Sequence, residues 1–509
     1  MPSLSVRRLT VTLFTFSVLG AAFQLSHFLV FCRGDPRFPP SPPSPYNLAQ
    51  RYHFLSRPNN SESDDMTEQK SSAPIRRFNV EDDEDDSHHD TNDYCEVVDE
   101  FGALAAERFC EAKDETGGDF RWIRLEKQLD KSLQSVRTER DVLDQIRLAT
   151  EEQAKYGNAA LFTRRWKHLK HGILNGVNDD ESDDSSSSFT VLQFNVLAEG
   201  LSAGPDATCP FTIVNDYYGR IDKNTYGGFT DVEQPETVLN FSLRRWRLLE
   251  VILGNQGTCP FDIVALEEVD RYYGFFSPMM RIFGYEGVFI PKSASPGVRM
   301  GWYSDGCALF WKKDMFELIS ERRVEYKVGN QVLLLAVLRH CATKNPLLVA
   351  VTHLKAQKSE TNEMIRCTQV EEIVVSVKED LAVLSEAFKT ATVPVLILGD
   401  FNADAPPQTE GTYSAIRTLL NSNVSPNHAP CSLQSAYEVD PPTENFYTTW
   451  KTRGTSTTRR IIDYILYGGN LSCRANLAVP EADELGEAKL PSFRHPSDHM
   501  SIAAKFDLT

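Results

Sequence analysis

The sequence contains few cysteines and no closely spaced pair of them. Its 509 residues include 10 cysteines, and none of these lies in a CxxC arrangement. A disulfide framework or a zinc site needs cysteines at short, regular spacings. The spacing therefore argues against both and favours reduced thiols in a compartment like the cytosol.

Internal repeats are missing, and so is an excess of positive charge. No segment recurs at a period of roughly 20–50 residues, which excludes a solenoid. The formal net charge is −18, but residues 61–100 hold 15 acidic and 3 basic side chains, and residues 179–184 add 5 acidic ones. Because the rest of the chain is close to neutral, the composition does not exclude an anionic substrate.

Residues 9–32 form an almost uncharged apolar run, preceded by two arginines. About 20 apolar residues are enough to cross a bilayer as a helix. We therefore expect residues 1–33 to be an anchor or targeting segment, with membrane attachment through residues 9–32. A cleaved signal peptide and an apolar organelle presequence are the alternatives. The expected location is cytoplasmic or organellar, in the mitochondrion or endoplasmic reticulum.

Composition divides the chain further. Residues 34–93 are rich in Pro, Ser and Asp and lack apolar periodicity, which predicts a disordered linker. Apolar residues at three- and four-residue steps predict a helical spacer over residues 94–177. Residues 178–188 form an acidic, serine-rich hinge, and the main domain is expected over residues 189–509.

The main domain alternates strand-like and helical segments. Apolar runs such as residues 191–197 and 393–401 are typical of strands buried on both faces. Residues 243–253 and 364–388 are predicted to be helical. The alternation predicts a layered α/β (α+β) fold.

Polar side chains occur at or just after several of the apolar runs. They belong to the segments FNVLA, ALEEVD, THLKA, LGDFNAD, IDYILY and HPSDH. Hard cations such as Mg²⁺ prefer oxygen ligands and leave coordination positions for substrate phosphate and water. We therefore expect these segments to converge on one metal-dependent phosphate site.

Two of the segments supply the expected metal site. Glu268 follows the run DIVAL, so its carboxylate should lie at the carboxyl end of a strand, while Glu267 should point to the opposite face. Asn195 also ends a strand-like run, where asparagine is unfavourable. We expect it to bind phosphate or to steady Glu268.

Four residues are candidates for catalysis. Asp400 and Asn402 are two apart, so in an extended segment both face one side, although an Asx turn is the alternative. Asp463 lies inside an apolar strand, where an unpaired charge is costly, and His499 can pair with it. A carboxylate raises the pKa of its histidine partner, so the pair can transfer protons near neutral pH. Asp498 adds a polar contact.

Basic residues complete the candidate site. His353 and Lys355 are two apart in THLKA, so both can face a phosphoryl group and stabilise its charge. Lys292, in IPKSASP, is expected to be a flexible cation near a turn.

Together these motifs resemble the endonuclease/exonuclease/phosphatase superfamily over about residues 189–509. The segments SDGCALFW, HLKA, YTTWK and PSFRHPSDH look most like the branch of nocturnin and the CCR4-type deadenylases. The resemblance implies a catalytic domain folded as a four-layer sandwich of two mixed sheets flanked by helices. No leucine-rich repeats precede it, unlike the CCR4 subunits that carry them.

The resemblance also implies roles for individual residues. Mg²⁺, or Mn²⁺, would be held at Glu268 and Asn195. The other roles form two groups: catalysis by Asp400, Asn402, Asp463 and His499, and substrate binding by His353, Lys355, Lys292, Arg366 and Asp498.

Two departures from the family pattern concern the substrate. Gln357 replaces an arginine that follows HLKA in nocturnin, and Arg366 is expected to serve in its place. Residues 202–240 are longer than the family loop, and they either shape the mouth of the site or pack on the surface.

The leading hypothesis is an Mg²⁺-dependent phosphohydrolase that removes the 2′-phosphate of NADP⁺ and NADPH. The alternative is a 3′-to-5′ exoribonuclease acting on adenylate-rich RNA, and a lipid phosphodiesterase or phosphoinositide phosphatase of the same superfamily is a third hypothesis. DNA is not an expected partner. A non-catalytic adaptor would have lost at least one catalytic position, and none is lost.

Overall fold

The structure, a computed structural model, describes one compact unit within residues 88–509. The described residues are 123–126, 129–169, 187–205, 207–211, 226–254, 261–390, 392–405, 414–425, 431–437, 446–487 and 489–508. The predicted anchor and linker, and almost all of the predicted hinge, lie outside them. Within the described ranges, no helix combines the length and the apolarity needed to span a bilayer.

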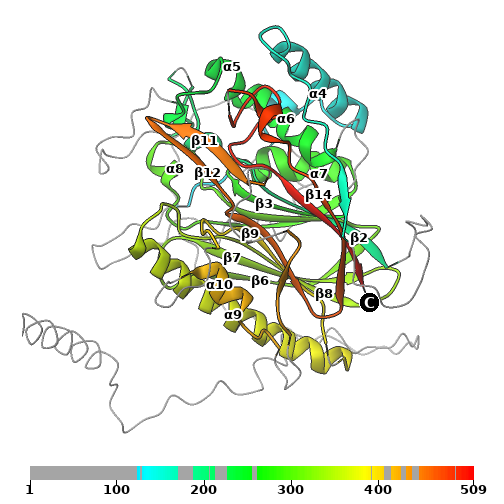
Figure 1. Ribbon diagram of the computed structural model, residues 1–509. Helices are drawn as coiled ribbons and strands as arrows, with labels where there is room; N and C mark the ends of the chain where they lie inside the picture. Colours follow the sequence, from blue (N-terminus) through cyan, green and yellow to red (C-terminus); the bar gives the residue numbers. More distant parts are fainter. Residues whose placement is uncertain are drawn as a thin grey trace, which may run out of the picture. The chain divides into compact units, whose positions relative to one another are not determined.

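Two mixed β-sheets form the centre of the molecule (Figure 1). In spatial order the first contains β1 (Trp166–His168), β14 (Leu471–Leu477), β15 (Ile502–Leu508), β2 (Ser188–Asn195), β3 (Ile263–Val269), β5 (Gly306–Lys312) and β4 (Tyr285–Pro291). The second contains β10 (Gln434–Ser435), β13 (Asp463–Gly468), β9 (Val395–Asp400), β8 (Pro346–His353), β7 (Val332–His340) and β6 (Phe316–Glu325). A separate hairpin consists of β11 (Thr449–Arg453) and β12 (Ser456–Arg460).

Each sheet has one parallel pair of strands near its centre. These pairs are β2 with β3 and β8 with β9, and the other pairs in both sheets are antiparallel. Because both pairs are parallel, the carboxyl ends of two neighbouring strands meet at one edge of each sheet. This arrangement decides where polar side chains at strand ends come together.

The two sheets pack face to face through their apolar side chains. The shared core contains, among others, Val191, Ile263, Leu309, Leu334, Val349 and Leu396, all fully buried. Because each central strand also buries its other face, these strands are continuously apolar in sequence, as predicted.

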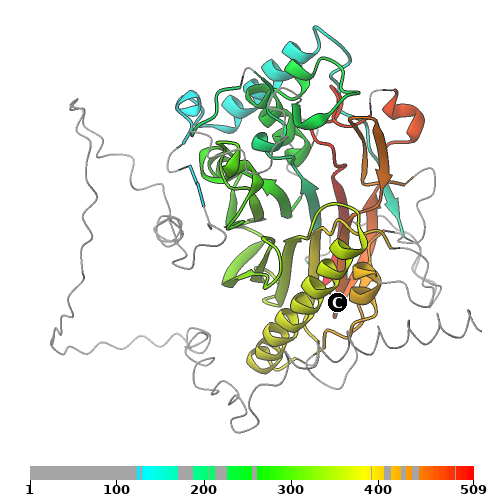
Figure 2. The ribbon, with the colours of Figure 1, turned by 90° about the vertical axis from the view of Figure 1, so that its left-hand side faces the viewer.

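Helices cover the outer face of each sheet. The helices α6 (Phe241–Leu253) and α7 (Ser277–Ile282) pack on the seven-stranded sheet, and α9 (Glu360–Phe388) and α10 (Ala415–Leu420) pack on the six-stranded one (Figures 1 and 2). The predicted four-layer α/β sandwich is confirmed, as are its helices over residues 243–253 and 364–388. Shorter elements are α5 (Pro235–Val238), α8 (Pro296–Arg299), α11 (Ala482–Leu485) and the turns Lys131–Leu133, Glu199–Leu201, Tyr226–Gly228 and Tyr272–Phe276.

The described part of the predicted spacer belongs to this body. Only α4 (Glu139–Gln153) is a regular α-helix there, because a capping box between Thr138 and Asp141 starts it late. Its buried face joins the core under α6, and β1 pairs with β14. The helical periodicity before residue 138 instead reflects an irregular segment whose apolar side chains are buried. Residues 129–169 therefore pack on the same core as the seven-stranded sheet.

Removing this segment should destabilise the protein. Leu133, Val142 and Phe162 are almost fully buried, and each such side chain contributes about 1.5–3 kcal/mol. Their combined loss is a large part of the stability of an ordinary domain. We expect a chain that begins at residue 187 to melt far below one that begins at residue 118, or to aggregate, in thermal unfolding. Equal melting temperatures would contradict this assignment.

Candidate active site

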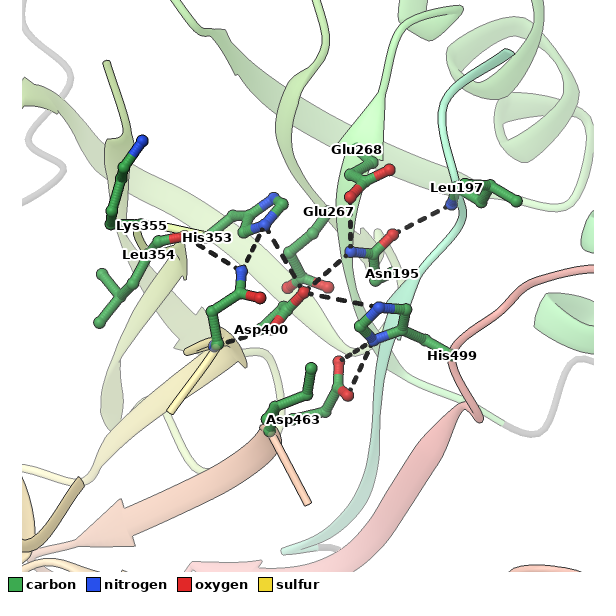
Figure 3. Close-up of polar contacts among 12 residues, drawn as sticks. Asn195, Leu197, Glu267, Glu268, His353, Leu354, Lys355, Asp400, Asp463 and His499 are labelled. Atoms are coloured by element: carbon green, nitrogen blue, oxygen red, sulfur yellow. Dashed lines mark hydrogen bonds and ion pairs between the residues drawn. The ribbon is translucent and has the colours of Figure 1, made fainter. Parts of the chain in front are cut away.

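The predicted site residues converge where strands of both sheets end (Figure 3). In register, Asn195 of β2 lies beside Glu267 of β3, and His353 of β8 lies beside Asp400 of β9. Asp463, the first residue of β13, pairs with Asp400 from the other side. The parallel pairs therefore bring their polar ends to one place, as the sequence predicted.

Asn195 links the two sheets at this point. Its side-chain nitrogen donates to Glu268 Oε1 at 3.2 Å and to Asp400 Oδ2 at 3.1 Å, while its Oδ1 accepts from the Leu197 amide at 3.0 Å. The bond to Glu268 agrees with the expectation that Asn195 steadies it. An amide oxygen has two lone pairs, so the bond from Leu197 does not exclude metal ligation by Asn195, which stays a prediction.

Glu268 occupies an unusual backbone position. Its φ is +57°, a left-handed value that is rare outside glycine, and β3 is bulged between Leu266 and Val269. Its carboxylate accepts from the Ala198 amide at 3.2 Å. Strained backbone of this kind concentrates at functional sites.

The neighbouring Glu267 is fully buried and accepts from Gln193 Nε2 at 2.7 Å. Burial raises the pKa of Glu267 well above its usual value, and the nearby Asp463 carboxylate raises it further. Two adjacent glutamates therefore have different surroundings, and only Glu268 has its carboxylate partly accessible.

Asp400 and Asn402 are held together by a turn rather than by an extended strand. The Asn402 amide donates to Asp400 Oδ1 at 2.9 Å, and Asn402 has a φ of +51°. Its side-chain amide lies 2.9 Å from His353 Nε2 and donates to the Leu354 carbonyl. The Asx turn weighed as an alternative is present, and it points both side chains into the site. Burial raises the pKa of Asp400 to about 6, against the lowering effect of His499.

His499 and Asp463 form the predicted pair. His499 Nδ1 lies 2.9 and 3.2 Å from the two carboxylate oxygens of Asp463, and both residues are almost fully buried. Burial disfavours the charged imidazole, but the carboxylates of Asp463 and Asp400 outweigh it and raise the pKa of His499 to about 9. His499 Nε2 faces Asp400 Oδ2 at 3.8 Å.

This geometry agrees with a comparison with known proteins. Residues 192–499 match the Endonuclease/Exonuclease/phosphatase family. The chain belongs to that family. It is 32% identical to nocturnin of Xenopus laevis over 66% of this chain and 76% of that protein. Nocturnin of Homo sapiens is 31% identical over 63% of this chain and 65% of that protein.

The chain is also similar to a CCR4-type protein and to a solved nocturnin structure. A Vairimorpha ceranae protein named "Probable CCR4-Not complex 3'-5'-exoribonuclease subunit Ccr4" is 28% identical over 54% of this chain and 60% of its own length. The solved structure of the human nocturnin catalytic domain with bound sulfate has 26% identity, a TM-score of 0.44, and coverage of 68% of this chain and 97% of that one. The chain is thus an endonuclease/exonuclease/phosphatase enzyme of the nocturnin and CCR4-like branch, a hydrolase of phosphate esters.

Enzymes of this family generally depend on a divalent metal, and the side chains present fit one. Ligand atoms of Asp400, Asp463 and His499 lie within 4.8 Å of one another, and Glu268 adjoins them through Asn195. A donor set dominated by carboxylate oxygens suits a hard divalent cation. Such an ion supplies positive charge at a phosphoryl oxygen when bound. The ammonium of Lys451, 3.3 Å from His499 Nε2, competes for the histidine side, which leaves Glu268 as the better ligand.

Lys292 is not the flexible cation that the sequence suggested. It is buried, its Nζ pairs with Asp305 at 2.6 Å, and it lies 3.2 Å from His353 Nδ1. Burial, followed by Lys292, holds the pKa of His353 well below its usual value. The ring is therefore fixed from both sides: Nδ1 faces Lys292, and Nε2 lies 2.9 Å from the Asn402 amide nitrogen and 3.5 Å from Asp400 Oδ2. Lys355 lies beyond His353, at the rim of the cluster (Figure 3).

Arg366 does not replace the missing arginine of the family. Its guanidinium is buried, binds Glu363, and donates to the carbonyls of Lys355 and Gln357 at 2.7 and 3.0 Å. These bonds shape the loop after β8, so the prediction of substrate contact by Arg366 is wrong. The spacing of Glu363 and Arg366 on a helix allows their pairing, but the two carbonyl partners are backbone atoms that the sequence does not identify.

Asp498 contacts cations of the β11–β12 hairpin that the sequence analysis missed. Its Oδ2 accepts from Lys451 Nζ at 2.5 Å and from Arg453 Nη2 at 3.2 Å. Burial opposes the charge on Asp498, but Lys451, His499 and Arg453 hold its pKa well below the usual range. Asp498 therefore positions cations beside His499 instead of facing substrate as predicted. Alternation in YTTWKTR could have revealed Lys451 and Arg453 as same-face residues.

A second residue missed by sequence reasoning is Arg244 of α6. Its fully buried guanidinium donates to the carbonyls of Val196 and Leu197, both at 2.8 Å, and to that of Pro496 at 3.4 Å. It thereby joins the turn after Asn195 to the loop that carries His499. An arginine on a helix next to apolar residues gave no signal of this role.

The buried His495 predicts how the stability of the fold changes at acid pH. Its Nε2 lies 2.8 Å from the His499 carbonyl, and burial lowers the pKa of His495 to about 3 from an unfolded value of 6.5. Between these values the unfolded chain binds more protons, so the stability present above pH 6.5 is lost as pH falls toward 3. We expect His495→Gln to lose less stability than the wild type between pH 7 and 4.5 in urea unfolding. Equal losses would contradict the assignment.

Proposed function

We propose that the chain is an Mg²⁺-dependent phosphohydrolase that removes the 2′-phosphate of NADP⁺ and NADPH, giving NAD(H) and phosphate. The convergence of Glu268, Asp400 and the Asp463–His499 pair carries the chemical part of this proposal. The resemblance of its motifs to nocturnin, together with 32% identity to a nocturnin, supports the choice of substrate.

Each side chain has a role that follows from its place. Glu268 would hold the ion, and Asn195 keeps its carboxylate in position. Asp400 and Asn402 orient the attacking water, since a carboxylate accepts its proton and a carboxamide binds a phosphoryl oxygen. His499 carries a proton toward the ribose oxygen that leaves, and Asp463 holds the ring.

Further groups stabilise charge on the phosphoryl oxygens. His353 lies beside Asp400, and the ammonium of Lys292, 3.2 Å from Nδ1, orients its ring. Lys451 places an ammonium within 3.3 Å of His499 Nε2. Such donors stabilise phosphoryl transfer because they are oriented before the substrate arrives.

A poly(A)-specific 3′-to-5′ exoribonuclease is the second candidate. The exoribonuclease subunit named above favours it, since it is 28% identical to this chain. A long RNA needs a row of cations beyond the reacting phosphate. Lys451 and Arg453, which both contact Asp498, are two cations of this kind among the described residues. The phosphates of a dinucleotide need no longer row.

Purified full-length protein given NADPH and oligo(A) in parallel separates the two candidates. We expect Mg²⁺-dependent release of phosphate from NADPH that EDTA abolishes, without shortening of oligo(A). RNA shortening without phosphate release would instead establish the exoribonuclease.

We also propose that residues 9–32 attach the enzyme to a membrane in the cytoplasm or an organelle. Their length and apolarity support this. A fluorescent fusion at the carboxyl terminus should fractionate with membranes, and protease protection should tell which side it faces. Recovery of the intact fusion in the soluble fraction would overturn the proposal.

A further inference from the structure

Part of the stretch that is longer than the family loop docks on the β11–β12 hairpin. Phe229 and Arg453 form a backbone bridge, and the Gly454 amide donates to the Gly228 carbonyl at 2.9 Å. The Thr230 hydroxyl donates to the Gly454 carbonyl at 2.8 Å. Residues 228–230 of this stretch therefore extend the hairpin.

The side chain of Phe229 lies between the hairpin and the turn that follows β2. It is 7% exposed and packs in one cluster with Leu197 and Leu239. The guanidinium carbon of Arg453 lies 4.3 Å from the centre of its ring. Leu197 is also the residue whose amide donates to Asn195. One aromatic ring thus contacts both a segment of the active site and a cation of the hairpin.

Arg453 is the outer member of a short row of cations. Lys451 and Arg453 are two apart on β11 and both pair with Asp498. Lys451 is the inner member, 3.3 Å from His499, and the side chain of Arg453 is 42% exposed. The row leads from the catalytic pair toward solvent.

We propose that Phe229 is a positioning residue for the substrate: its ring holds the Arg453 guanidinium in place to bind a phosphate of the nucleotide. The inference rests on the proposed phosphohydrolase function of the same site. According to this inference, the long stretch contributes to substrate affinity through the contact between Phe229 and Arg453.

The expected effect follows from the nature of the contact. An arginine over an aromatic ring gains a modest cation–π attraction and loses rotamer freedom before it binds. The same benefit applies to bound substrate and to the transition state, so its loss raises KM and leaves kcat nearly unchanged. A defect in the catalytic pair would lower kcat instead.

Two substitutions at Phe229 distinguish the effect of the aromatic face from the effect of the side-chain volume. Phe229→Leu keeps an apolar side chain against Leu197 and Leu239 but removes the aromatic face, whereas Phe229→Tyr keeps it. We expect Phe229→Leu to raise KM for NADPH about fivefold, the size of a cation–π contact, with kcat within about twofold. Phe229→Tyr should restore the wild-type KM.

A double-mutant cycle with Arg453→Ala tests whether the ring acts through the guanidinium. If it does, Phe229→Leu has no further effect on KM once Arg453 is alanine. Equal effects of Phe229→Leu in both backgrounds, or a fall in kcat with KM unchanged, would overturn the inference.

Calorimetric binding of adenosine 2′-monophosphate, measured on the same four proteins, keeps this test independent of turnover. If the wild type does not hydrolyse NADPH, the proposed function fails, but coupling of Phe229 and Arg453 in binding still supports the inference. If turnover is present and the binding cycle shows no coupling, the inference alone fails.

Discussion

Replacing Glu268 by glutamine should lower kcat/KM by about 10³-fold or more. The substitution keeps the size and the hydrogen-bonding capacity of the side chain but removes the charge that holds a divalent ion. The ion supplies several kcal/mol of transition-state stabilisation, and each 1.36 kcal/mol corresponds to tenfold in rate. Initial rates with NADPH over a range of Mg²⁺ concentrations measure the loss, and calorimetric Mg²⁺ titration should show weaker binding.

The adjacent residue provides a matched control. Glu267 is buried, and its pKa is raised first by burial and then by Asp463, so glutamine mimics its uncharged form. We expect Glu267→Gln to retain activity within about threefold and to bind Mg²⁺ as the wild type does. Similar losses for both variants would show that Glu268 has no special role. Thermal unfolding of each variant confirms that the fold is intact.

Replacing His499 by glutamine should lower kcat by about 10²–10⁴-fold, the usual contribution of a positioned proton donor. The carboxylates of Asp463 and Asp400 overcome the effect of burial and raise the pKa of His499 to about 9. The histidine is therefore charged at neutral pH, and its proton is lost as pH rises through about 9. Activity that needs this proton should decline above that pH, and a pH profile of kcat measures it.

Two comparisons test the assignment. Asp463→Asn leaves the ring without its carboxylate, so the alkaline decline should move to lower pH. The double variant Asp463→Asn, His499→Gln should be hardly worse than His499→Gln alone, because the two residues act as a unit. If kcat of His499→Gln still declines at the same alkaline pH as kcat of the wild type, that decline belongs to another group.

The convergence of polar residues at the strand ends could be predicted because the sequence patterns that indicate it are local. Runs such as residues 393–398 are apolar at every position and are followed within two residues by a polar one, here Asp400, and parallel neighbours place such ends together. The pairing of Asp463 with His499 was also predictable, since a carboxylate inside an apolar strand requires a partner. The structure brings both expectations together at one place.

The errors concern groups whose partners are distant in sequence or belong to the backbone. Lys292 looked mobile because nothing near it in the sequence indicates burial, yet Asp305 and His353 surround it. Arg366 looked available because two of its acceptors are carbonyl oxygens, which no sequence motif identifies, and only Glu363 is a side-chain partner. The spacing of Asp400 and Asn402 suggested an extended strand, whereas local hydrogen bonding closes a turn.

The site is divided between the two sheets, and this has a consequence for distant parts of the interior. Asn195 and Glu268 belong to one sheet, and Asp400 and Asp463 to the other, so the 3.1 Å contact between Asn195 and Asp400 spans the seam. The separation of the two sheets, which depends on core side chains such as Val349, therefore sets the distance between Asn195 and Asp400. A bulkier side chain at position 349 would increase the separation of the sheets and impair turnover, although this residue is buried in the core.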